Sequence, residues 1–156
     1  MKKLVFFMVA VLIANAISPA LLGGVPSGRA LYCGGTVAAL PGNTEGTVAT
    51  TGEREFVFAS KTQRFAIPYD RVNLLEFGQK AGRRLGLALA VSPLLLLSKK
   101  RRHFLTIHFL DDQGGQQAMV LELGKNLVRA TLAGLEARTG LKVEYQDEEA
   151  RLTGRG

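Results

Sequence analysis

With 156 residues, the chain is long enough for one domain with a hydrophobic core and too short for several. It carries 20 Lys and Arg against 13 Asp and Glu, but the excess lies in one segment, because seven basic residues and no acidic one fall between Glu76 and Asp111. This distribution argues against a uniformly basic nucleic-acid-binding chain and favours one local surface that is both positive and apolar.

The first twenty residues have the pattern of a secretory signal peptide. Two lysines precede an apolar core from Leu4 to about Ile13, and small residues follow it. Two alternatives remain open: residues 4–22 as an uncleaved membrane anchor, and a buried N-terminal helix in a cytosolic protein. We expect a signal peptide or anchor over 1–20, a linker over 21–30, and an exported, periplasmic or otherwise extracytoplasmic, membrane-associated domain.

From residue 31, short runs of β-branched and aromatic residues alternate with Gly, Pro, Asn and Asp, which predicts seven strands. Cys33 lies in the first predicted strand and is the only cysteine of the chain. We expect it to be a buried structural thiol. The predicted strands cover residues 32–38, 46–51, 55–59, 64–68, 71–78, 103–110 and 116–123.

The last two predicted strands form the clearest hairpin. Leu105, Ile107 and Phe109 share one face of the first strand, apolar residues alternate likewise in the second, and "DDQGG" supplies the turn. Such alternation predicts one buried face and one wetter face.

The hydrophobic period changes after residue 124. Val128, Leu132 and Leu135 recur at helical spacing, which predicts a helix of about fifteen residues. Gly140 is placed for a left-handed cap, with Leu141 folding back onto the helix. Residues 146–156 are highly charged and nearly free of apolar residues, so we expect a disordered tail.

Seven antiparallel strands followed by one amphipathic helix predict a mainly β fold, α+β by content: a bent sheet or open barrel capped by the C-terminal helix. This order, with "YCGGTVAALPGNTEGTVAT", "REFVFAS", "FAIPYDRVNLLEFG" and "NLVRATLAGLEARTG", resembles the pleckstrin-homology-like superfold, in particular its GRAM-type and bacterial members. The resemblance covers roughly residues 31–145, interrupted by an insert at 80–102. It implies a binding or scaffolding module rather than a catalyst. It does not extend to the family's basic pocket at the first hairpin loop, because "ALPGNTEG" has no Lys or Arg.

The insert has an apolar run between two arginines and four consecutive basic residues, "GRRLGLALAVSPLLLLSKKRRH". As a helix, residues 85–98 would be about 21 Å long, short of the roughly 30 Å hydrocarbon core, and Pro93 would break it. A single membrane span is therefore disfavoured. Three interpretations remain: a wedge at the lipid interface, a buried helix or strand pair within the domain, and an oligomer contact.

In the lipid interpretation, two sets of residues form the site. Those expected at an anionic surface are basic: Lys80, Arg83, Arg84, Lys99, Lys100, Arg101 and Arg102. Those expected to contact the membrane or a partner are apolar: Leu85, Leu87, Leu89, Val91, Leu94, Leu95, Leu96 and Leu97.

No constellation of side chains predicts catalysis. His103 and His108 are five apart on one predicted strand, so they point to opposite faces, cannot chelate one metal and are expected to be partly exposed. Asp111 and Asp112 lie in a predicted turn, and the acids at 147–149 have no positioned partner. We expect no enzymatic activity, no cofactor and no metal site.

These patterns predict a non-catalytic binding module, exported across the cytoplasmic membrane, that associates with anionic lipid or a membrane-embedded protein through the insert. The alternative is a soluble structural or scaffolding subunit that uses the same insert as a protein–protein or homo-oligomer contact. A more distant alternative is a small hydrolase with an unrecognised site. Four adjacent basic residues are a weak signal for nucleic acid, which we do not expect as a partner.

Overall fold

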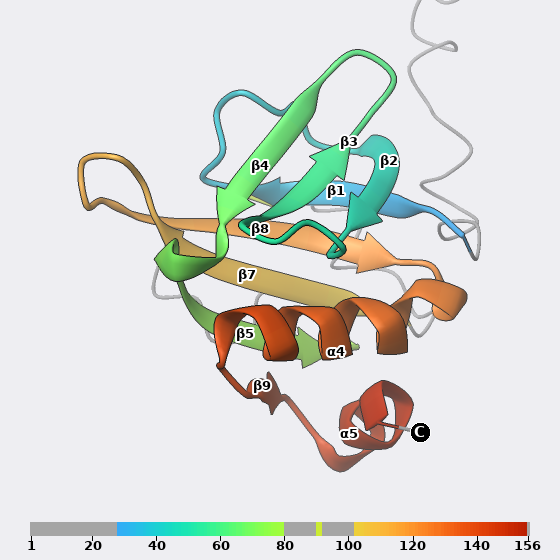
Figure 1. Ribbon diagram of the computed structural model, residues 1–156. Helices are drawn as coiled ribbons and strands as arrows, with labels where there is room; N and C mark the ends of the chain where they lie inside the picture. The colour runs from blue at the N-terminus through green and yellow to red at the C-terminus, as the bar shows by residue number, and fades with distance from the viewer. Residues whose placement is uncertain (1–27, 80–89, 92–101, 156) are drawn as a thin grey trace, which may run out of the picture.

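The computed structural model describes residues 28–79, 90–91 (backbone alone) and 102–155 (Figure 1). Its strands are β1 (Ala30–Gly35), β2 (Thr44–Ala49), β3 (Glu55–Ala59), β4 (Arg64–Pro68), β5 (Val72–Gly78), β6 (Ala90–Val91), β7 (Phe104–Leu110), β8 (Gln116–Leu123) and β9 (Val143–Tyr145). Its helical elements are η1 (Tyr69–Arg71), η2 (Lys125–Leu127), α4 (Val128–Thr139) and α5 (Glu148–Arg155).

The strands form one open, mixed sheet in the order β4-β3-β2-β1-β8-β7-β5-β9, and β6 pairs with β1. All pairings are antiparallel except that of β9 with β5. The predicted mainly β fold with a C-terminal helix is confirmed. β1 lies earlier than predicted, because its register against β8 shifts after Tyr32 and the chain then continues through two glycines with positive φ.

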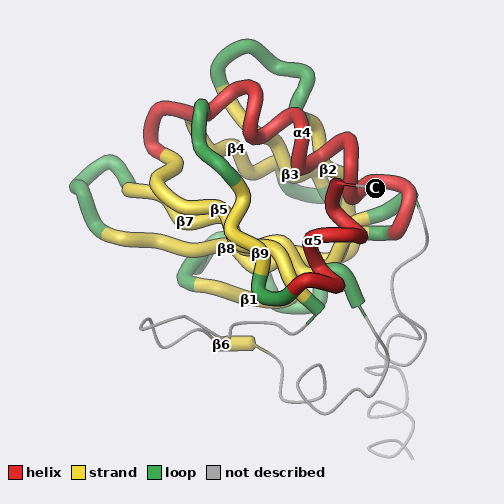
Figure 2. The backbone as a smooth tube through the Cα atoms, turned by 90° about the horizontal axis from the view of Figure 1, so that it is seen from below, coloured by secondary structure: helices red, strands yellow, loops and turns green. Residues whose placement is uncertain are grey.

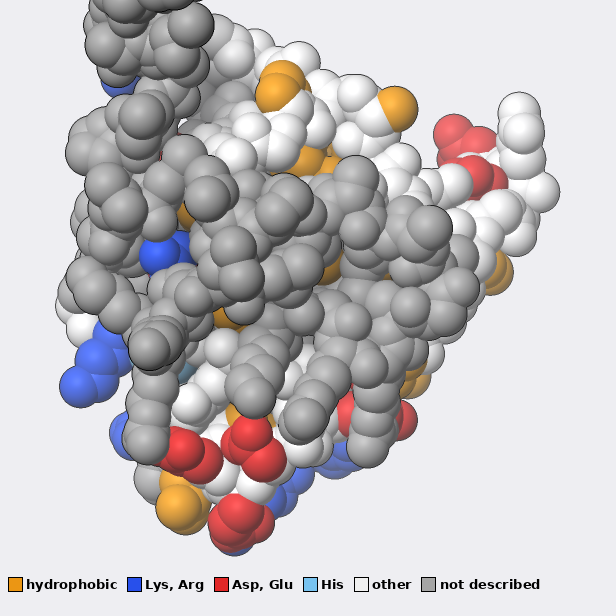
Figure 3. Space-filling model, turned by 180° about the vertical axis from the view of Figure 1, so that it is seen from behind, with side chains coloured by type: hydrophobic (Ala, Val, Ile, Leu, Met, Phe, Trp, Pro, Cys, Tyr) orange, Lys and Arg blue, Asp and Glu red, His pale blue; other side chains and the backbone are white. Residues whose placement is uncertain are grey.

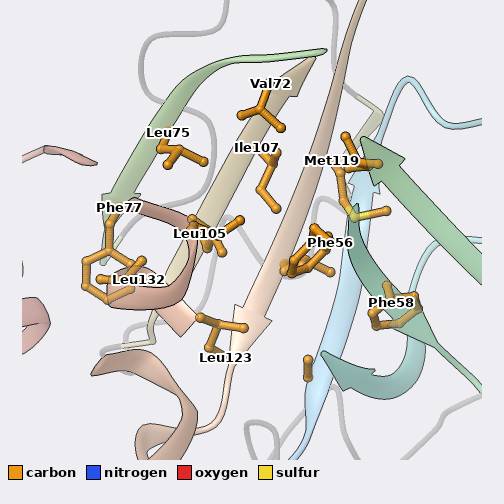
Figure 4. Packing of buried hydrophobic residues seen from close by; sticks show 14 of the residues in the cluster. Phe56, Phe58, Val72, Leu75, Phe77, Leu105, Ile107, Met119, Leu123 and Leu132 are labelled. Carbon is orange, nitrogen blue, oxygen red and sulfur yellow. The ribbon is translucent and has the colours of Figure 1, made fainter. Parts of the chain in front are cut away.

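The hydrophobic core lies between the sheet and α4, which crosses one face of β5 and β7 (Figure 1). Figure 4 shows Leu105 and Ile107 of β7 beside Phe56 of β3, with Leu132 of α4 against Phe77 of β5. Complete burial of side chains this large contributes about 1.5–3 kcal/mol each, which makes this face the main source of stability.

β2 bends the sheet over the core at Gly46. Gly46 is paired with Ala30 of β1, whereas the next residue, Thr47, is paired with Ala59 of β3. A Cβ atom on Gly46 would lie 2.5 Å from the Ala59 carbonyl oxygen and 2.7 Å from the Phe58 ring. Glycine is therefore required for the close approach that brings β3 and β4 over the core.

α4 ends as the sequence predicts. Gly140 has φ 74° and donates its backbone N–H to the Glu136 carbonyl at 3.0 Å, which is the left-handed cap expected of it. Leu141 then packs against the core, and Val128, Leu132 and Leu135 are buried.

The C-terminal segment is ordered, contrary to the disordered tail expected from its charge. β9 adds Val143, 4% exposed, to the edge of β5, and α5 places Gly154 against Tyr145 and Leu132. The Asp147 side chain accepts the Ala150 N–H at 2.7 Å and so caps α5. Small residues that fit an existing apolar surface order this segment despite its polar composition.

Candidate functional site: the end of the sheet where the insert joins

The insert leaves and re-enters the domain at one place. It follows β5, which ends at Gly78, and returns through Arg102 and His103 into β7; Gly78 is paired with Phe104 across the two strands. Of the predicted site residues, Arg102 and the backbone of Val91 are described. The remainder lie outside the described residues: Lys80, Arg83, Arg84, Leu85, Leu87, Leu89, Leu94, Leu95, Leu96, Leu97, Lys99, Lys100 and Arg101.

The N-terminal segment joins the domain beside the insert. At the end of β8, Leu123 donates its backbone N–H to the His103 carbonyl at 2.8 Å, and Gly124 donates to the Arg29 carbonyl at 2.9 Å. We call the part of the sheet formed by Arg29, Gly78, His103 and Gly124 the junction end; it is on the right in Figure 1. The expected signal peptide or anchor at 1–20 lies outside the described residues.

Cationic side chains follow directly on the junction end. Lys125, next to Gly124, and Arg129, in the first turn of α4, are both exposed. The His103 ring stacks on Phe77, with ring centroids 6.2 Å apart and 10° between the planes. Burial lowers the pKa of His103, and the negative charge of Glu122 raises it in part. The positive charge of Lys125 lowers this pKa further, so Lys125 influences the residue at which the insert returns to the sheet.

The middle of the insert reaches β1. Ala90 and Val91 form β6, which pairs with Gly35 and Gly34 and lies on the side of the sheet away from α4 (Figure 2). A Cβ atom on Gly35 would lie 2.2 Å from the Ala118 carbonyl oxygen, and Gly35 has φ 145°. Glycine therefore permits the backbone course at which β6 attaches.

Arg102 forms a buried ion pair. The Arg102 Nη1 lies 2.8 Å from the Glu122 Oε2, and both side chains are 3% exposed. The sequence expectation for Arg102 was contact with an anionic surface; the structure instead commits its guanidinium to β8. Nearby, burial and then the charge of Glu122 raise the pKa of Cys33 to about 12. The prediction of a buried thiol is confirmed.

His108 forms a second buried pair on the same face. Its Nε2 lies 3.0 Å from the Glu76 Oε2, and the histidine is 7% exposed rather than partly exposed as expected. The expected opposite orientation of the two histidines is confirmed, because His103 stacks on Phe77, a residue of the core on the other face. The difference in burial arises because Glu76 of β5 offers His108 a polar partner on a covered face.

The two turn aspartates have local structural roles, as predicted. Asp111 Oδ1 accepts the N–H groups of Gly115 at 2.7 Å and Gln113 at 2.9 Å. These hydrogen bonds, that from Gly115 first, lower the pKa of Asp111. Asp112 forms an ion pair with Arg71 across the hairpin.

A cleft of about 460 Å³ opens between the start of β2 and the β3–β4 turn, next to the junction end. Arg29 and Lys61 line it together with Glu45. Part of its hydroxyl lining is used locally, since Ser60 Oγ accepts two backbone N–H groups of its own turn. Within the described ranges, no three side chains capable of binding a metal are grouped together.

No protein-family model matches the chain, and no curated protein matches it significantly. Among the helices of the described residues, none has the length and apolar character to cross a membrane.

Proposed function

We propose that this protein is a non-catalytic, pleckstrin-homology-like binding module of the extracytoplasmic side. It associates with membrane lipid, or with a protein embedded in the membrane, through the insert at 80–102. The proposal joins the character of the insert's sequence to the place at which the folded domain presents it.

The observation that carries the proposal is the convergence at the junction end. At the end of β8, backbone hydrogen bonds hold Arg29, where the N-terminal segment enters, and His103, where the insert returns. The insert starts after Gly78, which is paired with Phe104, the residue next to His103. The segments that contain the two longest apolar runs of the chain, 4–22 and 85–97, thus join the described domain at one end. Segments that leave from one end can meet one membrane without rearrangement of the domain.

The strand order supports the pleckstrin-homology-like part of the proposal. The seven predicted strands pair antiparallel in the sheet order β4-β3-β2-β1-β8-β7-β5. The helix α4 follows β8, the last of these strands in the sequence. The insert occupies the connection from β5 to β7, where a long excursion leaves the pairing of both strands intact. Two residues of the insert form β6 and pair with β1, and the pairing of β5 with β7 does not require the rest of its length.

The magnitudes are sufficient for peripheral attachment. Burial of half of the eight apolar insert side chains would contribute about 6–12 kcal/mol before ordering costs. Each basic residue near an anionic surface adds about 1 kcal/mol. Arg102 is left out of this second contribution because its guanidinium is paired with Glu122.

Vesicle flotation of the full chain tests the proposal. We expect salt-sensitive binding to vesicles of phosphatidylcholine with phosphatidylserine, and its loss when Leu95→Asp and Leu96→Asp are combined. The matched control combines Ala38→Asp and Ala39→Asp, an adjacent exposed pair in the loop after β1, which introduces the same two charges at the opposite end. The control is expected to bind like the unmodified chain.

Two results would contradict the proposal. Binding by the leucine variant equal to that of the control removes the insert from the contact. A fall in oligomeric mass of the leucine variant, with vesicle binding unchanged, replaces the proposal by the scaffolding alternative.

A further inference from the structure

We infer that Lys125 and Arg129, on the folded domain itself, contact the phosphate groups of an anionic membrane surface at the junction end. This inference rests on the proposed function and deepens it, because it assigns to the same membrane contact a second, cationic part outside the insert. The two residues are called the cationic corner below.

The cationic corner lies beside two of the points at which segments outside the described residues join the domain, Arg29 and His103. Lys125 follows Gly124, whose N–H is bonded to the Arg29 carbonyl, and it is close enough to His103 to affect the pKa of that ring. Arg129 lies four residues further along the chain, in the first turn of α4, and both side chains are exposed. Lipid that meets the insert and the N-terminal segment here would lie within reach of both side chains.

Folding by itself does not account for cations at this position. The first turn of α4 contains no acidic residue, and no side chain caps the N-terminus of the helix. The N-terminus is the positive end of the helix dipole, so Lys125 and Arg129 are placed where a cation is disfavoured. An external anion would be attracted by the two side chains and by the helix dipole together.

The charges around the corner define one favoured orientation. The nearest carboxylate of β8, Glu122, is buried and paired with Arg102, so it does not neutralise the corner. Acidic residues lie on the other side of the junction end, where Gln146 donates its N–H to the Phe77 carbonyl at 3.0 Å and the acids at 147–149 follow. In the view from behind, Lys and Arg side chains lie along the left edge of the molecule, and both acidic and basic side chains lie at its lower edge (Figure 3). An anionic surface would therefore meet the β1–β8–α4 side first.

The opposite end of the molecule differs in where its cations lie. Arg71 is paired there with Asp112, and the loop at 36–43 contains neither Lys nor Arg. At the far end of α4, Arg138 and Lys142 are exposed and provide two cations of equal charge away from the junction end. These two residues supply a matched comparison.

The test measures the partition of the full chain onto phosphatidylcholine vesicles with and without phosphatidylserine. Lys125→Gln combined with Arg129→Gln is expected to weaken binding to the anionic vesicles by about fivefold per charge, or roughly 25-fold together. Arg138→Gln combined with Lys142→Gln is expected to leave it within about twofold, since these charges lie at the other end of α4. Circular dichroism of both variants checks that the fold is retained.

The outcomes separate this inference from the proposed function. Equal binding by the two glutamine variants, with the Leu95→Asp and Leu96→Asp variant still defective, overturns the cationic corner and leaves the insert as the contact. Weakened binding by the corner variant alone supports the corner and overturns the role of the insert. Absence of binding by the unmodified chain overturns both.

Discussion

The two faces of the sheet are both buried, but they are built from different chemistry. On β7, Leu105 and Ile107 face α4 and the apolar core, whereas Thr106 and His108, also buried, lie on the reverse face. The reverse face also carries the Glu76–His108 and Arg102–Glu122 pairs.

The difference shows that a buried face of this sheet need not be an apolar one. Strand alternation sends neighbouring residues to opposite faces, so an alternating sequence predicts two chemistries but not which of them is covered. On the reverse face Arg102 and Glu122 carry opposite charges, and the Glu76 carboxylate has the His108 imidazole at hydrogen-bond distance. Burial of a charge requires such partners.

The largest expected effect comes from breaking the ion pair of the reverse face. Arg102→Leu removes the guanidinium from the buried Glu122 carboxylate, and we expect the free energy of unfolding to fall by about 3–5 kcal/mol. Urea denaturation measures it. Combining Arg102→Leu with Glu122→Leu should recover most of the loss, because both charges are then removed. A loss below about 1 kcal/mol in the single variant, the value of an exposed pair, would contradict the buried role.

A matched change on the helix-covered face should act by a different mechanism. Ile107→Ala opens a cavity among fully buried neighbours, and we expect a loss of about 2–5 kcal/mol. Ile107→Val should cost only about 0.5–1.5 kcal/mol. Removing a charge elsewhere should not recover this loss, whereas Glu122→Leu should recover most of the loss caused by Arg102→Leu. Equal effects of the alanine and valine variants in urea denaturation would argue against tight packing at this position.

The second pair of the reverse face should contribute less. His108→Leu leaves the Glu76 carboxylate without the hydrogen bond of the imidazole, for which we expect a loss of about 1–3 kcal/mol. Glu76→Gln keeps a hydrogen-bonding oxygen beside His108 and should cost less than His108→Leu. The reverse ranking in denaturation experiments would show that the pair does not hold this part of the face.

The smallest expected effect is a pH dependence of stability that arises from His103 at the junction end. The pKa of His103 is lowered below 6.5 chiefly by burial, so the unfolded chain binds this proton more readily than the folded protein. The free energy of unfolding should therefore decrease as the pH falls through 6.5, and level off below the lowered pKa. His103→Phe keeps an aromatic ring on Phe77 and should reduce the difference in stability between pH 7 and pH 5. An unchanged difference would contradict the assignment to His103.

Prediction from the sequence was most complete where local patterns decide the structure. β3 and β4 have the predicted bounds, and the Gly140 cap follows from the one residue type that adopts positive φ freely. It was least complete for α5 and for the ion pairs. Glu76 and Glu122 read as ordinary polar positions of a strand, and no spacing along the chain shows that His108 and Arg102 lie beside them.

The candidate site divides in the same way. The charge excess and apolar run of the insert are visible in the sequence, and both remain predictions for residues outside the described ranges. Lys125 and Arg129 were missed because they belong to a part of the chain in which basic and acidic residues balance. The proximity of Lys125 to Arg29 and His103 arises only when β8 lies between β1 and β7.

The amino-acid sequence by itself indicated seven of the nine described strands, the helix α4 and its cap, because hydrophobic period and glycine conformation act within a few residues. Only the tertiary structure decided which polar residues are buried as pairs, that the charged C-terminus is ordered, and that the N-terminus and both ends of the insert share one end of the sheet. These properties depend on contacts between residues far apart in the chain, and such contacts exist only once the strands are paired.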